Sequence, residues 1–181
     1  MTDITNLSTV NVAISNYSAV VTMNNPPVNA QNRQFHDDLT LAFDVLSDRN
    51  DVRSIVLTGA GKCFSAGADI KGRASQETDL GDHWVHSRRV RECFYAIMEC
   101  RKPVIAAING AALGAGLAVA ASADILIASE SASVGLPEIN VGLLGGGRHA
   151  MRLFGHSKTR RLMLTGQRLS GAELYRLGAV E

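Results

Sequence analysis

Two short segments near the start of the chain, residues 10–14 and 19–23, alternate apolar and polar positions. The turn-forming stretch SNYS separates them, so the pattern predicts a β-hairpin. Apolar residues then recur every three or four positions over residues 31–48, which is the spacing of an amphipathic helix. A compact apolar run at 55–57 predicts a buried strand, and helical spacing returns over 84–98. Strands and helices therefore follow one another along this half of the chain.

The stretch from 104 to 128 is almost entirely apolar and is long enough to cross a bilayer. Three polar residues interrupt it, however, and one of them is Asp124. A carboxylate near the centre of a membrane helix costs about 2.5–3.5 kcal/mol on insertion scales. We therefore predict a buried β-α-β unit and no membrane partner. Its strand, helix and second strand, with a glycine turn after the first strand, lie at 104–108, 115–121 and 125–128.

Shorter elements are predicted in the last third of the chain, namely a strand near 133–134 and three helical segments at 148–154, 157–165 and 171–177. The alternation of strands and helices predicts an α/β fold with much parallel strand pairing. No linker or internal repeat divides the sequence, so we expect residues 1–181 to form a single domain.

Charge and cysteine content narrow the choice of partners. The formal net charge is +1, which gives no electrostatic reason to expect binding to nucleic acid or to an anionic membrane. The three cysteines have no CxxC spacing and no metal-binding arrangement with histidine, so no metal is predicted. Their odd number, with no apolar leader at the start of the chain, predicts a reducing, cytoplasmic location. Cys93 and Cys100 lie seven residues apart and are predicted to share one helix face.

A glycine-rich segment, GAGKCFSAGAD at 59–69, follows the strand predicted at 55–57 and raises the question of a phosphate loop. Its spacing does not fit one. Val56 occupies the position of the first P-loop glycine, and Cys63 stands where a serine or threonine should bind Mg²⁺. Phe64 replaces the third glycine of the dinucleotide-binding fingerprint. Binding of ATP or NAD stays an alternative, which a nucleotide effect on the melting temperature would reveal.

Three stretches carry more information together than singly: CFSAGADIK at 63–71, INGAALGAGLAVA at 108–120 and SVGLPEINVGLLGG at 133–146. In this order they resemble the crotonase family, also called the enoyl-CoA hydratase/isomerase family. The resemblance extends from the predicted hairpin to LTGQRLSGAELYRLGAV near the end of the chain. It implies an α/β fold, a ββα spiral in which helices flank parallel sheets. Family members continue into a C-terminal helical region that supports trimers, and we expect this chain to lack that region.

The resemblance also implies the substrate and the groups that hold it. In the family, two backbone N–H groups bind the thioester oxygen of an acyl-CoA, and the matching donors here belong to Ala68 and Ala115. Glycines beside them let the main chain approach the thioester closely. The thioester is the substrate, so no cofactor is implied, and a homo-oligomer (a trimer or a dimer of trimers) is implied where the C-terminal region is present. The groups that hold CoA correspond to Val28, Ala30, Ala66, Asp69 and Ile70.

The acid–base residues separate members of the family. Its hydratases use two glutamates that hold a water molecule and move its proton. The first position is occupied here by Ala118, whereas the second is present as Glu138 in the sequence GLPEI. A single carboxylate can take a proton from one carbon of an enoyl thioester and return it to another. The resemblance therefore implies an acyl-CoA-processing lyase or isomerase of fatty acid metabolism, with isomerisation-type chemistry favoured.

Two alternatives follow from the missing glutamate. The protein can be an enoyl-CoA hydratase (a lyase) that orients water with another group, or a catalytically weak homologue that binds acyl-CoA. His149 is a candidate for a second acid–base group or for a contact with the acyl group, although a partly exposed helical histidine explains it equally well. Asp69 is expected to orient its loop by hydrogen bonding to the backbone. The segment 71–86, which lines the acyl pocket in the family, shows no interpretable pattern.

Overall fold

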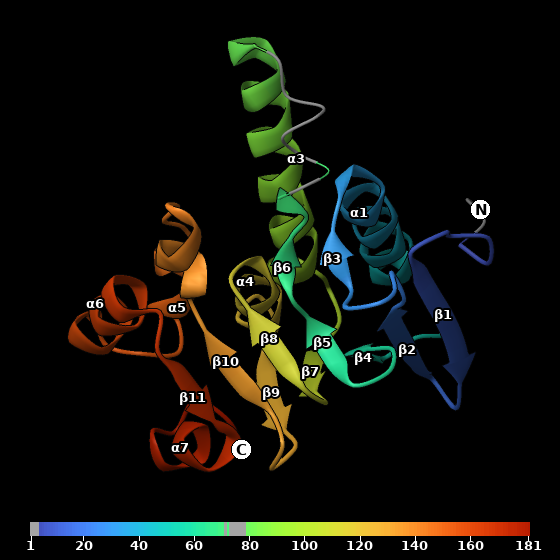
Figure 1. Ribbon diagram of the computed structural model, residues 1–181. Helices are drawn as coiled ribbons and strands as arrows, with labels where there is room; N and C mark the ends of the chain where they lie inside the picture. The colour runs from blue at the N-terminus through green and yellow to red at the C-terminus, as the bar shows by residue number, and fades with distance from the viewer. Residues whose placement is uncertain (1–3, 71, 73–78) are drawn as a thin grey trace.

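The fold is built from three β-sheets flanked by helices (Figure 1). The computed structural model describes residues 4–70, 72 and 79–181. The part of the expected acyl-pocket segment at 71 and 73–78 lies outside the described residues. No helix in the described part of the chain is long and apolar enough to cross a bilayer.

The largest sheet has five strands in the order β1-β2-β4-β7-β9. β1 and β2 form the predicted antiparallel hairpin, with a tight turn in which Asn16 and Tyr17 have positive φ angles of 48° and 63°. β4, β7 and β9 then add in parallel, which confirms the predicted parallel pairing. The strand bounds are β1 (Val10–Ser15), β2 (Ser18–Met23), β4 (Ser54–Gly59), β7 (Val104–Ile108) and β9 (Ile125–Ala128).

The second sheet has four strands in the order β11-β10-β8-β5, and β3 pairs with β6 in a separate two-stranded ladder. Strands that follow one another in the chain alternate between the two larger sheets: β4 then β5, β7 then β8, β9 then β10. This alternation is the expected ββα spiral. The bounds are β3 (Ala30–Gln31), β5 (Cys63–Ser65), β6 (Gly67–Ala68), β8 (Ala111–Leu113), β10 (Ser133–Gly135) and β11 (Arg168–Ser170).

The helices agree with the predicted segments apart from their ends. They are α1 (Arg33–Asp48), α3 (Leu80–Met98), α4 (Ala115–Ala120), α5 (Gly147–Ala150), α6 (His156–Thr165) and α7 (Gly171–Arg176), with a 3₁₀ helix η1 (Pro137–Val141). α1 begins where the Asn32 side chain accepts a hydrogen bond from the Phe35 N–H, and it packs along α3. These two helices form one wall of the site described below.

Two predictions about the helical region were wrong. Cys93 is buried in α3, but Cys100 lies beyond the end of that helix and is only partly buried, so the two thiols do not share a helix face. The predicted glycine turn before α4 contains strand β8. This strand has three residues, too few to show the alternation that predicts a strand from sequence. α3 also begins four residues earlier than predicted, because the Asp79 carboxylate caps it by accepting a hydrogen bond from the Asp82 N–H.

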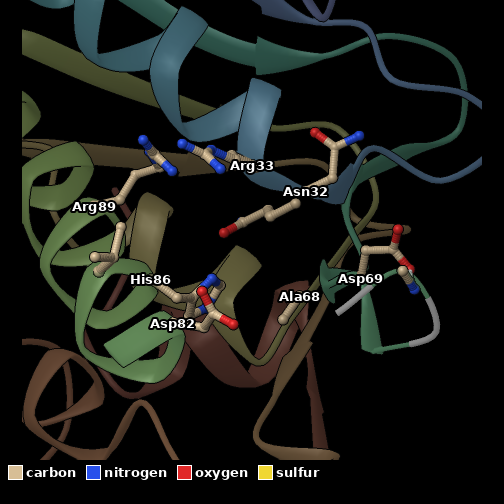
Figure 2. Close-up of a pocket in the computed structure, with 10 residues that line it drawn as sticks. Asn32, Arg33, Ala68, Asp69, Asp82, His86 and Arg89 are labelled. Atoms are coloured by element: carbon tan, nitrogen blue, oxygen red, sulfur yellow. Dashed lines mark hydrogen bonds between the residues drawn. The ribbon is translucent and has the colours of Figure 1, made fainter. Parts of the chain in front are cut away.

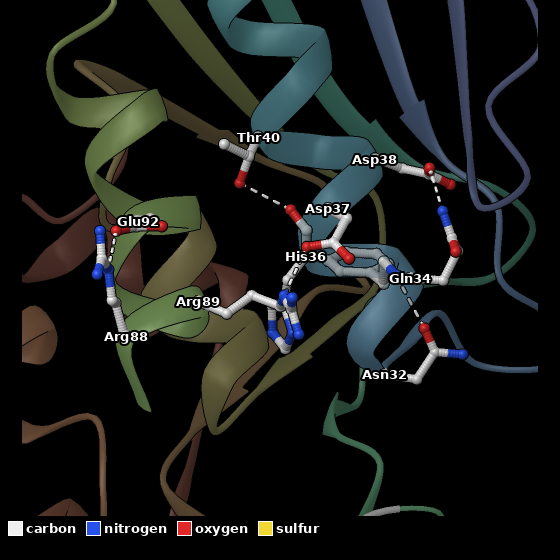
Figure 3. A network of polar contacts seen from close by, with 10 residues as sticks. Asn32, Gln34, His36, Asp37, Asp38, Thr40, Arg88, Arg89 and Glu92 are labelled. Carbon is white, nitrogen blue, oxygen red and sulfur yellow. Dashed lines mark hydrogen bonds and ion pairs between the residues drawn. The ribbon is translucent and has the colours of Figure 1, made fainter. Parts of the chain in front are cut away.

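The N-terminal segment is fastened to α1 through the carboxylate of Asp38, which Figure 3 shows beside Gln34. Asp38 Oδ2 accepts hydrogen bonds from the backbone N–H groups of Ser8 and Thr9 at 3.0 and 2.9 Å, and Oδ1 accepts one from Gln34 Nε2 at 2.8 Å. Burial by itself raises the pKa of Asp38, but the hydrogen bonds outweigh burial and hold that pKa below its ordinary value. This anchor fixes α1, which carries a histidine of the candidate site.

The glycine-rich segment that raised the phosphate question is the tight connection from β4 to β5. Two asparagine side chains bind its carbonyl oxygens. Asn109 Nδ2 donates to Gly59 O and Gly61 O at 2.9 and 3.0 Å, and Asn29 Nδ2 donates to Cys63 O at 2.7 Å. In this arrangement the glycines allow the chain to turn tightly from β4 in the first sheet into β5 in the second.

Candidate active site

The candidate site lies at the carboxyl ends of three neighbouring strands of the second sheet. β5, β8 and β10 are adjacent and parallel, so the segments that follow them emerge at the same edge. Ala68 comes three residues after β5, Ala115 two residues after β8, and Glu138 three residues after β10. Ligands of α/β proteins bind at such edges, because the chain leaves the sheet there in variable loops. The topology therefore brings together the three residues that the sequence singled out for catalysis.

Close approach of the first two segments depends on glycine. Gly67 has a φ of +94°, and a Cβ at this position would lie 2.6 Å from Leu113 O and 3.2 Å from Ala115 N. The first distance is shorter than real Cβ contacts, the second is tighter than most of them, and the backbone angle is one that side chains rarely adopt. Only glycine at position 67 lets the turn before Ala68 lie against the turn before Ala115.

Two backbone N–H groups are directed away from the surrounding secondary structure. The Asp69 N–H donates to Gln31 O at 3.0 Å, and successive N–H groups in a strand point to opposite sides, so the Ala68 N–H faces away from β3. Ala115 is the first residue of α4, whose first backbone bond runs from Ala118 N to Gly114 O at 3.1 Å. The Ala115 N–H therefore has no acceptor within its own helix.

Both residues line one cavity of about 550 Å³. Its walls come from α1, α3, α4, η1 and the loop before α5. Most of the lining is apolar, and the polar groups within it are few. The apolar side chains include Val90, Phe94, Ala118, Val141, Leu143 and Leu144, and the polar ones include Glu138, Asn140, Arg168 and three histidines. Such a mixture is typical of a small-molecule site.

Glu138 lies directly over the second of the two turns. A Cβ built on Gly114, whose φ is +56°, would sit 2.7 Å from Glu138 Oε1, so glycine at 114 leaves room for the carboxylate. The other oxygen, Oε2, is buried and has no hydrogen-bond partner among the described residues. Burial raises the pKa of Glu138 above its ordinary value. A buried carboxyl group with a free oxygen and a raised pKa is suited to accept and return a proton.

Ala118 and His149 stand in the wall of the same cavity. Ala118 lies one helical turn beyond Ala115 in α4, so no carboxylate approaches from that position. The His149 ring meets the Phe94 ring edge-on, with centroids 4.6 Å apart. Burial, together with Arg152 and Arg148, lowers the pKa of His149, which leaves the ring neutral near pH 7. His149 is thus in reach of a ligand, and its neutral ring offers one donor and one acceptor.

The five positions expected to hold CoA do not all face this cavity. Ala66 and Ile70 line it, whereas Asp69 lines a smaller adjoining cavity of about 110 Å³. Val28 and Ala30 line neither, but the Ala66 N–H donates to Val28 O at 3.0 Å and ties their segment to the site. Asp69 Oδ1 accepts a hydrogen bond from the Gly72 N–H at 3.0 Å, the backbone contact expected of it.

Most residues that line the smaller cavity are polar or charged (Figure 2). Arg33 from α1 and Arg89 from α3 project toward it, and Ala68 and His86 line both cavities. Arg89 also forms an ion pair with Asp37 at 2.6 Å. Within the described residues, no group of three or more histidine, cysteine, aspartate or glutamate side chains is arranged to hold a metal ion.

Sequence reasoning missed two histidines of the main cavity, His36 in α1 and His86 in α3. The signal for His36 was present, because it lies three residues before Leu39 and seven before Phe43 on the buried stripe of α1. A histidine at a core position of an amphipathic helix is unusual, so His36 could have been singled out from the sequence. His86 lies beside the segment that showed no interpretable pattern, and only the packing of α3 on α1 brings it to the site.

Comparison with known proteins identifies the class to which this fold belongs. Residues 13–181 match the family described as enoyl-CoA hydratase/isomerase. A probable enoyl-CoA hydratase of Bacillus subtilis is 38% identical over 177 residues, which are 96% of this chain and 68% of that protein. The chain therefore belongs to the enoyl-CoA hydratase/isomerase family, as the resemblance indicated.

Two further relatives show how widely the family varies. A Mycobacterium tuberculosis protein named as (7aS)-7a-methyl-1,5-dioxo-2,3,5,6,7,7a-hexahydro-1H-indene-carboxyl-CoA hydrolase is 38% identical over 162 residues, 88% of this chain and 64% of its own length. The structure of Pseudomonas aeruginosa DspI aligns with a TM-score of 0.87 at 35% identity, and covers 95% of this chain and 71% of DspI. The chain thus spans about two thirds of the length of these relatives.

Proposed function

We propose that the protein processes acyl-CoA thioesters by proton transfer, and that it favours double-bond isomerisation of enoyl-CoA. The observation that carries this proposal is the Glu138 carboxylate, held half-buried over the turn that exposes the Ala115 N–H, with one oxygen left unpartnered. In this proposal the N–H groups of Ala68 and Ala115 form an oxyanion hole. The CoA moiety contacts the segments of Val28, Ala30, Ala66, Asp69 and Ile70.

The proposed chemistry needs only these groups. The thioester oxygen of a 3-enoyl-CoA accepts hydrogen bonds from the two N–H groups, which makes the hydrogens at C2 more acidic. Glu138 removes one proton from C2, and the electron pair delocalises through the dienolate to the thioester oxygen. The protonated Glu138 then returns the proton to C4, which yields the 2-enoyl-CoA and regenerates the carboxylate. Each preorganised donor contributes about 3–4 kcal/mol to stabilisation of the enolate-like transition state.

Isomerisation is favoured over hydration because the second carboxylate is missing. Ala118 occupies the wall where a hydratase of the family has its other glutamate, so water has one carboxylate fewer to orient it. Hydration stays a second candidate on the strength of His149, a neutral ring in the same cavity. A third candidate is an acyl-CoA-binding homologue with little turnover.

Incubation in D₂O with 3-hexenoyl-CoA and with crotonyl-CoA separates the three candidates. We expect 2-hexenoyl-CoA with no hydroxyacyl product, when the products are analysed by NMR and mass spectrometry. The product should carry deuterium to the extent that the protonated Glu138 exchanges with D₂O before it returns the proton to C4. Formation of 3-hydroxyacyl-CoA from crotonyl-CoA contradicts the preference for isomerisation and directs attention to His149. Binding of both thioesters with neither deuterium exchange nor 2-enoyl product from 3-hexenoyl-CoA contradicts the enzymatic proposal and supports the binding homologue.

The raised pKa of Glu138 gives the proposal a pH signature. Glu138 must be ionised to remove the proton, so kcat/KM for 3-hexenoyl-CoA should fall as the pH drops through the pKa of the free enzyme. Because burial raises that pKa, we expect the loss at a higher pH than an exposed glutamate would give. An acid limb within the ordinary carboxyl range contradicts the assignment of Glu138.

Stability changes in the opposite direction. The folded state binds the Glu138 proton more tightly than the unfolded state does, so this contribution to stability is present below the ordinary carboxyl pKa and is lost as the pH rises through the raised one. The melting temperature of Glu138→Gln relative to the parent protein should therefore increase over the same pH interval in which activity appears.

Two broader expectations also stay proposals. We propose that residues 1–181 form one domain, since the buried apolar residues of both larger sheets and their helices belong to one continuous core. We also propose a homo-oligomer, which the resemblance implies where the C-terminal region is present, and a reducing, cytoplasmic location, which the odd number of cysteines favours.

A further inference from the structure

His36 is a buried polar residue without a partner. Its side chain is 1% exposed, and neither ring nitrogen has a hydrogen bond among the described residues. Buried polar groups are nearly always satisfied, and an unsatisfied one costs about 1–3 kcal/mol. Gln31 Oε1 and Glu138 Oε2 also lack a hydrogen-bond partner among the described residues. Gln31 lines the smaller cavity and Glu138 lines the larger one. Of the four described residues with such atoms, three therefore lie around the candidate site, and the fourth, Thr159, lies in α6.

The surroundings of His36 fix its position, but none of the described residues forms a hydrogen bond with its ring nitrogens (Figure 3). The Thr40 hydroxyl donates to the backbone carbonyl of His36 at 2.7 Å, and the rings of Phe35 and His86 meet the imidazole edge-on at 5.9 and 6.0 Å between centroids. Burial, together with His86 and Arg89, lowers the pKa of His36 to about 4. The ring is therefore neutral at pH 7, with one donor nitrogen and one acceptor nitrogen.

His36 reaches the cavity from a different element than the proposed catalytic residue Glu138 does. It comes from α1, whereas Glu138 comes from η1, and both residues line the same space with Ala68 and Ala115. His86, which meets the His36 ring, also borders the smaller polar cavity. The rest of the α3 wall, including Val90 and Phe94, is apolar and suits a hydrocarbon. Within the wall formed by α1 and α3, the polar lining side chains are thus His36 and His86.

We propose that His36 is a specificity-determining residue that selects acyl groups carrying a hydrogen-bonding oxygen beyond the thioester: a hydroxyl, a ketone or a carboxyl group. This inference rests on the proposed function, since it requires acyl-CoA in the cavity. An oxygenated acyl chain supplies the partner that the His36 ring lacks. A plain hydrocarbon chain leaves the buried ring unsatisfied in the complex. Sites built to hydrogen-bond a substrate group discriminate strongly against analogues that lack it.

Binding of four saturated thioesters of equal chain length tests the proposal without relying on turnover. The probes are hexanoyl-CoA, 6-hydroxyhexanoyl-CoA, 5-oxohexanoyl-CoA and adipoyl-CoA, measured by calorimetry on the 181-residue chain. We expect at least one oxygenated thioester to bind about tenfold more tightly than hexanoyl-CoA, the effect of one good hydrogen bond. The preferred probe identifies the oxygen as hydroxyl, ketone or carboxylate.

The variant His36→Phe, with His36→Leu as a second apolar replacement, provides the control. Both variants should bind hexanoyl-CoA as the parent protein does and should lose the preference for the oxygenated thioester. Their melting temperatures should equal or exceed that of the parent, because the unsatisfied polar atoms are removed. His156→Phe, an exposed histidine at the start of α6, should keep the preference unchanged.

Four results would overturn the inference, and they are distinguishable. Equal affinities for all four thioesters, or a preference that survives in His36→Phe, remove His36 as the selecting residue while the proposed function stands. A lower melting temperature in both apolar variants shows that His36 has a structural partner instead. If none of the four thioesters binds, the proposed function fails and the inference fails with it.

Discussion

The Glu138→Gln variant is expected to lose about 10³-fold in kcat for conversion of 3-hexenoyl-CoA to 2-hexenoyl-CoA, within the range of general acid–base catalysis. Glutamine keeps the shape of the side chain over Gly114 but cannot accept the proton from C2. The thioester contacts are unaffected, so KM should change little. The measurement is the rate of deuterium incorporation and product formation in D₂O.

A charge-matched control comes from Glu130, whose exposed side chain follows β9. Glu130→Gln removes the same charge away from the cavity and should retain the activity of the parent protein. If Glu138→Gln keeps activity within a few-fold of Glu130→Gln, the proton is moved by another group and the single-carboxylate mechanism is wrong.

The second large effect is expected from Ala115→Pro, which deletes one backbone donor of the proposed oxyanion hole. Proline is well tolerated at the first position of a helix, where the missing N–H has no intrahelical acceptor. Residue 114 is a glycine with a φ of +56°, so the residue before the new proline is conformationally free. We expect a loss of 10²–10³-fold in kcat, about 3–4 kcal/mol of transition-state stabilisation.

The matched control is His156→Pro, at the first position of α6, where the N–H does not face the cavity. Both proline variants should retain a cooperative melting transition, and only Ala115→Pro should lose activity. Equal activity of the two variants would show that the Ala115 N–H does not stabilise the enolate. If Ala115→Pro alone loses cooperative melting, the Gly67→Ala variant becomes the test instead. A Cβ at position 67 would clash with Leu113 O and displace the N–H donor of Ala68.

The two predictions rest on one property of the fold. The spiral places β5, β8 and β10 side by side, so residues separated by about seventy positions in the chain meet at one sheet edge. The oxyanion donors belong to the backbone, which makes their placement depend on sheet register more than on side-chain identity. Substitutions that shift this register should therefore reduce activity even where no reacting group is changed.

The amino-acid sequence by itself determined the long elements and the identity of the catalytic candidates. The hairpin of β1 and β2, the strands β4, β7 and β9, and the stripe of α1 follow from the pattern of apolar positions, because burying one face of a long element requires a regular pattern. Glu138 was recognised from its neighbours in the chain, since a motif is local. The sequence also indicated the family, which the comparisons confirmed.

Only the tertiary structure decided the short strands, the cavity and the state of its polar groups. β3, β5, β6, β8 and β11 have two or three residues each, too few to display a period, and they exist because a neighbouring strand pairs with them. Burial of Glu138 and of His36 depends on residues that are distant in the chain. Desolvation acts through space, so the raised pKa of Glu138 and the unpartnered ring of His36 could be found only in the folded molecule.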